Sequence, residues 1–155
     1  MIARLSPLFA GAALVLAAAG AQAQDCPAAP VFVGVTAANS DVRASQSRVE
    51  RGDWAVAQHF ATEALESGTS SRNKAAAQIN LCAALANQAA EGAADACDTA
   101  VAMNEERWEA YTNRGAAFWL AGDREAAAAD FARAAELGAG EAEVATNTAL
   151  ASCAG

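Results

Sequence analysis

The chain is poor in the residues from which most catalytic centres are built. It has a single histidine, His59, and four scattered cysteines with no C-x-x-C pair among them. A zinc site needs a compact set of such ligands, and this set is too small and dispersed. There is no G-x-S-x-G motif, and the Gly-x-Gly at 138–140 follows a predicted helix rather than a strand. The sequence therefore predicts no enzyme, no cofactor, no metal and no small-molecule substrate.

Positive charge is also scarce. The chain has ten lysine and arginine residues and eighteen aspartate and glutamate residues, which gives a formal net charge of -8. An acidic surface repels phosphate backbones and anionic lipid head groups. Nucleic acid and membrane-surface partners are therefore disfavoured.

Large apolar side chains are few. Hydrophobic residues make up 54% of the sequence, but many of them are alanine and only 6% of residues are aromatic. Each buried alanine removes little apolar area from water, so the core needs close helix contacts or covalent links. A length of 155 residues is enough for one domain of ordinary size.

Residues 1–23 have the composition of a secretory signal peptide. One positive charge, Arg4, precedes an uncharged apolar run, and the segment ends in the small-residue pattern Ala21-Gln22-Ala23. This A-x-A pattern predicts cleavage after Ala23. The alternative is an uncleaved membrane anchor, but the apolar run is shorter than the ~20 residues needed to span a bilayer. The sequence thus predicts export and, in a bacterium, a periplasmic location.

Residues 24–38 form a predicted extended N-terminal arm. The segment holds two prolines, a glycine and a β-branched run, so it cannot be helical throughout. Val31, Phe32, Val33 and Val35 can lie against the following helices, and the alternative is a frayed terminus.

Residues 39–155 form the predicted all-α domain, because helix signals follow one another without a strand pattern. Asn39, Ser40 and Asp41 offer N-caps, and two Gly-Asp pairs, at 52–53 and 122–123, mark turns between helices. Glu105 and Glu106 are expected in a first helical turn. The predicted helices span residues 40–51, 54–66, 72–87, 91–103, 105–121, 124–137 and 141–153.

The stretch 108–138 is the clearest helix, turn, helix unit, and its features recur along the chain. One helical face carries Tyr111, Gly115 and Phe118, and the next helix carries Ala127, Phe131 and Ala134. Glycine at 115 is expected to let the two backbones approach closely. Three asparagines, Asn80, Asn113 and Asn147, recur at separations of 33 and 34 residues.

A period near 34 residues with a helical pair in each unit resembles the tetratricopeptide repeat (TPR) family. In the unit around Gly115 the family's aromatic, glycine, turn and alanine positions are kept. The preceding unit is degenerate, with Cys82, Leu85 and Cys97 at signature positions, and the first unit has Ser45 in place of the glycine. The resemblance implies a small exported bacterial TPR protein: a right-handed helical-hairpin solenoid of three repeats with a C-terminal capping helix.

The family resemblance also implies a concave groove that accepts a peptide or a partner's helix. The groove positions carried over to this chain are Asn80, Asn113 and Asn147, with Arg43 as the equivalent in the first unit and Gln46 one turn on. Trp119 is expected on the groove side as an aromatic anchor. The alternative is that the asparagines bridge adjacent helices and Trp119 packs under the turn.

The even cysteine count in an exported chain favours two disulfides, for which three connectivities are possible. The repeat arrangement places Cys82 and Cys97 on the two helices of one unit, which favours that pair and leaves Cys26 with Cys153. The competing interpretation is that Cys82 and Cys97 are reduced core residues.

Two functions follow as expectations. The first is an exported interaction module that binds a peptide or partner protein in its groove. The second is a structural or oligomerising subunit of an envelope assembly, with the groove filled by its own arm. The position of the arm separates them, and the sequence leaves the oligomeric state open.

Overall fold

The computed structural model describes residues 26–153, and in this range the chain forms seven α-helices and no β-strand. The helices are Ser40–Arg51 (α1), Trp54–Glu66 (α2), Ser71–Asn87 (α3), Ala93–Met103 (α4), Trp108–Ala121 (α5), Arg124–Leu137 (α6) and Ala142–Cys153 (α7). The predicted all-α class is confirmed. The predicted signal peptide at 1–23 lies outside the described residues, and within these none of the helices is long and apolar enough to cross a bilayer.

Helix ends fall where the turn residues predict them. The Asn39 side chain accepts hydrogen bonds from the backbone N–H groups of Asp41 and Val42, which caps the start of α1. Gly52 and Gly122 end α1 and α5 in the left-handed conformation, with φ of 74° and 89°.

Two helix starts differ from the prediction by more than one residue. Helix α5 begins at Trp108 rather than at residue 105, so Glu105 and Glu106 lie in the preceding turn. The cause is local, because the Asn104 side chain accepts a hydrogen bond from Glu106 N–H and its carbonyl accepts one from Arg107 N–H. Helix α4 begins at Ala93 rather than at 91, after a left-handed Gly92.

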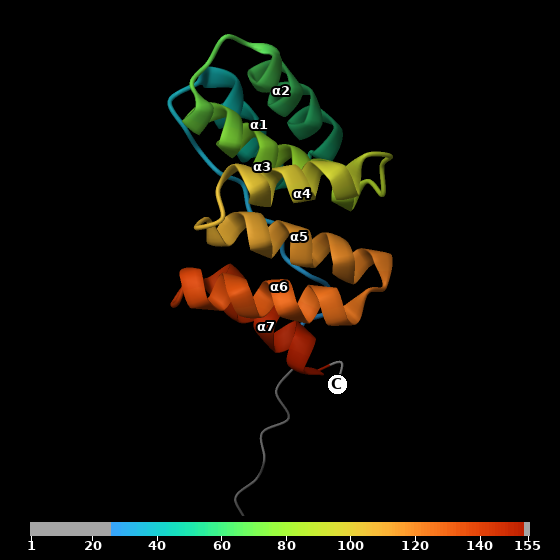
Figure 1. Ribbon diagram of the computed structural model, residues 1–155. Helices are drawn as coiled ribbons and strands as arrows, with labels where there is room; N and C mark the ends of the chain where they lie inside the picture. Colours follow the sequence, from blue (N-terminus) through green and yellow to red (C-terminus); the bar gives the residue numbers. More distant parts are fainter. Residues whose placement is uncertain (1–25, 154–155) are drawn as a thin grey trace, which may run out of the picture.

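The helices pack as successive pairs, α1 with α2, α3 with α4 and α5 with α6, and α7 packs on α6. The odd-numbered helices also contact one another in series, α1 with α3, α3 with α5 and α5 with α7. Figure 1 shows the pairs stacked along one direction, with the blue N-terminal segment crossing the stack to reach α7. One face of the molecule is therefore formed by the odd-numbered helices, and we call it the inner face.

The core is built from alanine and allows close helix contacts. Gly115 of α5 makes one such contact, because a Cβ atom placed on it would lie 2.7 Å from ring carbons of Phe131 on α6. The predicted close approach of the two helices at Gly115 is thus confirmed.

Two disulfides close the structure, and both predicted pairings are confirmed. Cys82 of α3 bonds to Cys97 of α4, and Cys26 bonds to Cys153 at the end of α7. Cys82 and Cys97 are buried, whereas Cys26 and Cys153 are exposed. Disulfides form and persist in oxidising compartments, so their presence indicates a location outside the cytoplasm.

We predict that Gly115→Ala destabilises the protein by about 1–3 kcal/mol, because the added methyl group overlaps the Phe131 ring. Urea denaturation measures the change. Gly68→Ala is the matched control, since nothing lies within 4 Å of a Cβ at that position. Equal stability of the two variants would contradict the close packing.

We further predict that a thiol reductant opens Cys26–Cys153 in the native protein while Cys82–Cys97 stays oxidised, because only the first bond is exposed. Differential alkylation followed by mass spectrometry identifies the reduced cysteines. In denaturant both bonds should open together. Simultaneous opening under native conditions would show that the buried bond is accessible.

Candidate functional site

The three recurring asparagines lie one on each of α3, α5 and α7, and all are fully buried. A buried amide side chain needs hydrogen-bond partners for both its oxygen and its NH₂ group. The N-terminal arm, residues 26–38, provides these partners. We call Asn80, Asn113 and Asn147 the asparagine row.

Each member of the row pairs with both backbone groups of one arm residue. Asn147 Oδ1 accepts from Val31 N–H at 2.8 Å, and its Nδ2 donates to Val31 O at 2.8 Å. Asn113 makes the same pair with Val33, at 2.8 and 2.9 Å. Asn80 makes it with Val35, at 2.6 and 2.9 Å. The arm therefore lies across the inner face, from Asn80 to Asn147.

The spacing of the held residues explains why one row can hold one extended segment. In an extended chain the N–H and C=O of a residue point to the same side, and this side repeats every second residue. Residues 31, 33 and 35 thus present their backbone groups to the three helices in turn. The contacts involve only backbone atoms of the arm, so they do not depend on its side chains.

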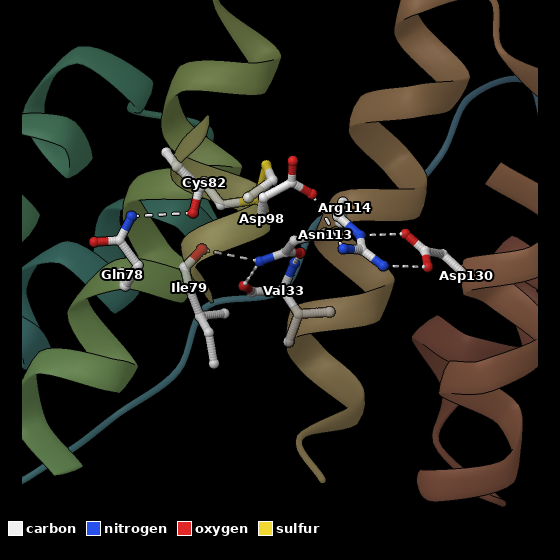
Figure 2. The surroundings of a disulfide bond; sticks show 10 residues. Val33, Gln78, Ile79, Cys82, Asp98, Asn113, Arg114 and Asp130 are labelled. Carbon is white, nitrogen blue, oxygen red and sulfur yellow. Dashed lines mark hydrogen bonds and ion pairs between the residues drawn. A yellow bond between two sulfur atoms is a disulfide. The ribbon is translucent and has the colours of Figure 1, made fainter. Parts of the chain in front are cut away.

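Two of the asparagines also join neighbouring helices. Asn113 Nδ2 donates to Ile79 O of α3 at 3.2 Å as well as to Val33 O, and Figure 2 shows this side chain between the two carbonyls. Asn80 Nδ2 donates to Ser45 Oγ of α1 at 2.7 Å. The row therefore holds the arm and links α1, α3 and α5 at the same points.

The arm's own side chains fit the surface beneath them. Val35 is buried, and the Phe32 ring packs edge-on against the Trp54 ring at a centroid distance of 5.9 Å. A Cβ atom at Gly34 would lie 2.8 Å from the Gln46 carbonyl oxygen of α1, so only glycine fits there without a shift. The segment 32–35 is thus matched to this face in shape as well as in backbone pairing.

Arg43 and Gln46 lie beside the arm but bind it differently from the asparagines. Arg43 Nη1 donates to Ala38 O at 2.5 Å, where the arm joins α1. The Gln46 side chain donates to Glu50 on its own helix, and its backbone contacts Gly34. Neither side chain makes the two-bond pairing of the row.

Trp119 is partly buried rather than open to solvent. It packs against the cluster of Ala116, Ala127 and Phe131, and the Arg124 guanidinium lies 3.7 Å from the centroid of its ring. Arg124 Nη1 also donates to the Trp119 carbonyl oxygen. The two residues close the turn between α5 and α6, so Arg124 would have to move before a partner could stack on the ring.

Sequence reasoning missed the ion-pair network of Arg114, the residue next to Asn113. Its guanidinium binds Asp130 of α6 through two hydrogen bonds of 2.7 and 2.9 Å, and Asp98 of α4 at 3.1 Å (Figure 2). The hydrogen bonds to Asp130 raise the pKa of Arg114 above its ordinary value. In the sequence, the only indication of this network is that Asp98 and Asp130 each lie 16 residues from Arg114. It links α5 to α4 and α6 at the residue next to Asn113.

The chemistry of the site is recognition of an extended backbone. Its polar groups are amides, which neither carry charge nor exchange protons at neutral pH. His59 is exposed on α2 and is not a member of the buried row. Within residues 26–153 no three histidine, cysteine, aspartate or glutamate side chains gather as metal ligands.

Substitution of the row should destabilise the protein in proportion to the hydrogen bonds lost. We expect Asn113→Ala to lower the free energy of unfolding by roughly 2–3 kcal/mol. Asn80→Ala should lower it more, and Asn147→Ala should lower it least. Urea denaturation gives the stability, and amide hydrogen exchange at Val33 reports the local loss for Asn113→Ala. Asn87→Ala, at an exposed position with no hydrogen bond to its side chain in the described structure, is the control. An equal loss of stability in all four variants would contradict a stabilising role for the hydrogen bonds between the row and the arm.

No protein-family model matches the chain, and neither does any curated protein. A functional proposal therefore depends on the geometry of the asparagine row and on the sequence resemblance to the tetratricopeptide repeat family.

Proposed function

We propose that the protein is an exported, periplasmic TPR-like protein that serves as a structural or oligomerising component of an envelope assembly, with its groove occupied by its own arm. The observation that carries this proposal is the pairing of all three asparagines of the row with Val31, Val33 and Val35. These are the positions at which the family resemblance would place a bound peptide.

The packing supports the TPR-like solenoid of three hairpins and a capping helix that this proposal includes. Helices pair in sequence order, and the odd-numbered helices contact one another on one face. Gly115 meets Phe131 at the close crossing of the best-kept unit. The row asparagines, one unit apart in sequence, share that face.

Energetics favour the arm over a foreign peptide. Its six hydrogen bonds with the row each contribute on the order of 1 kcal/mol. The arm is also attached at both ends, to α1 at Asn39 and to α7 through Cys26–Cys153. A segment tethered in this way acts at an effective concentration of millimolar order or higher, which a free ligand must exceed.

Capture of a foreign peptide by the row is the second candidate function. It is favoured by the fact that the asparagines bind only backbone atoms of the arm, so they would accept another extended segment. The arm must first leave the inner face, because it uses every member of the row. The two candidates therefore differ in whether the oxidised protein has a free site.

The proposal places the mature chain in the periplasm and includes no catalytic activity. The two disulfides support an oxidising compartment, and the predicted leader at 1–23 supports export. The amides of the row support binding rather than turnover.

A labelled peptide corresponding to residues 29–37 tests whether the site is free. We predict no saturable binding to the oxidised mature protein at up to about 100 µM, a concentration that would saturate a site of micromolar affinity. Fluorescence anisotropy measures the binding. A scrambled peptide is the control, and saturable binding of the arm peptide alone would favour the second candidate.

The structural role is tested separately by the size of the protein in its native envelope fraction. Chemical crosslinking in intact cells, followed by blotting, should give a defined species larger than the 15.6 kDa chain. The protein should still exclude the arm peptide after purification from that species. Migration as a monomer alone would overturn the assembly role.

A further inference from the structure

The arm is the one ligand that the asparagine row binds in this structure. We propose that the arm also seats in the row of a second copy of this chain, so that copies assemble by arm exchange and are joined by disulfides between Cys26 of one copy and Cys153 of the other. This inference extends the proposed function, because it names the partner of the self-occupied groove.

The arm can leave without breaking any helix. Among the described residues, the backbone hydrogen bonds of arm residues 27–38 are all to side chains, those of the asparagine row and of Arg43. The first backbone–backbone hydrogen bond of the body is Arg43 N–H to Asn39 O. The arm is thus a separate extended ligand attached to the body by continuity with α1.

The connection between arm and body is short. Val35 is held by Asn80, and α1 begins at Ser40, so residues 36–39 alone make the turn between them. Short connections of this kind favour exchange of a terminal segment between identical copies. Every contact of the exchanged arm is the same as in one chain, so the balance between the two forms depends on protein concentration.

The disulfide that fixes the arm is placed for exchange. Cys26 and Cys153 are exposed, so a small thiolate can reach their bond, whereas Cys82–Cys97 is buried. The thiolate attacks Cys26 Sγ, forms a mixed disulfide there and releases Cys153 as a thiolate.

The second step joins two copies. The Cys153 thiolate of one copy attacks the mixed disulfide at Cys26 of another, forms the intermolecular bond and expels the small thiolate. The same two steps then join Cys153 of the second copy to Cys26 of the first. In this way two intramolecular bonds are replaced by two intermolecular bonds. The thiolate is regenerated, and there is no net oxidation or reduction.

Two single variants of the mature chain make the exchange visible. Cys26→Ser and Cys153→Ser each retain one exposed thiol, so neither can close the intramolecular bond. Mixed in a glutathione redox buffer, they can form a Cys26–Cys153 heterodimer or homodimers through like cysteines. Non-reducing gels with mass spectrometry of the linked peptides measure each product.

We expect the heterodimer to exceed both homodimers together by at least about tenfold, because a seated arm holds Cys26 beside Cys153 at high effective concentration. The statistical mixture of hetero- and homodimers would overturn the proposal. The yield should also rise with total protein concentration.

A matched pair of arm variants shows whether the excess depends on the row. Val33→Pro removes the N–H that Asn113 accepts, whereas Val33→Ala keeps it. Introduced into both chains, the proline should bring the product ratio close to the statistical mixture, and the alanine should leave the excess in place. An equal ratio of heterodimer to homodimers for the two variants would mean that the bond forms by random collision and not because the arm binds the row. Circular dichroism checks that the helical body is unchanged.

The outcomes also separate this inference from the proposed function. If the heterodimer excess is absent while the oxidised protein still excludes the arm peptide, the groove is self-occupied and only the exchange is wrong. If the oxidised protein binds the arm peptide, the proposed function itself is wrong.

Discussion

The structure depends on the pairing of three buried amide side chains with one extended segment. An asparagine with no solvent contact and no partner costs on the order of 1–3 kcal/mol. Without the arm, Asn80, Asn113 and Asn147 would each lose the two hydrogen bonds that they make with its backbone. The helices position the asparagines, and the arm satisfies them, so neither part reaches its lowest free energy alone. The arm for this reason completes the hydrogen bonding of the buried asparagines, and its Val35 is buried with the core.

The alanine-rich core makes this dependence stronger, and a disulfide adds a covalent link between α3 and α4. In the unit of α5 and α6, Gly115 and Phe131 meet at the helix crossing. The corresponding positions one repeat earlier are Cys82 and Cys97, which are bonded to each other. A covalent bond that closes a loop of 15 residues stabilises by about 3 kcal/mol. Cys82 and Cys97 are both buried, so this bond lies within the core between α3 and α4.

Sequence reasoning reached the all-α class and the disulfides because both follow from local or periodic signals. Gly52 and Gly122 end helices by their own conformational preference, and the expected helical hairpin places Cys82 on one helix and Cys97 on the next. The start of α5 was predicted wrongly because Asn104 forms a turn with Glu106 and Arg107 that competes with the helix. The Arg114 network and the stacking of Arg124 on Trp119 depend on side-chain positions in three dimensions, which periodicity does not encode.

The register of the arm shows most clearly where sequence reasoning ends. Alternating valines at 31, 33 and 35 indicate an extended segment, and the recurring asparagines indicate a row. Neither pattern says that the two meet, because the backbone groups of an extended chain are the same in every sequence. What selects this arm is the shape of the surface beside the row, where Gly34 meets the Gln46 backbone and Phe32 meets Trp54. The amides of this surface bind the backbone of the arm, and the contacts at Gly34 and Phe32 match its shape, so its own segment fits it in both respects.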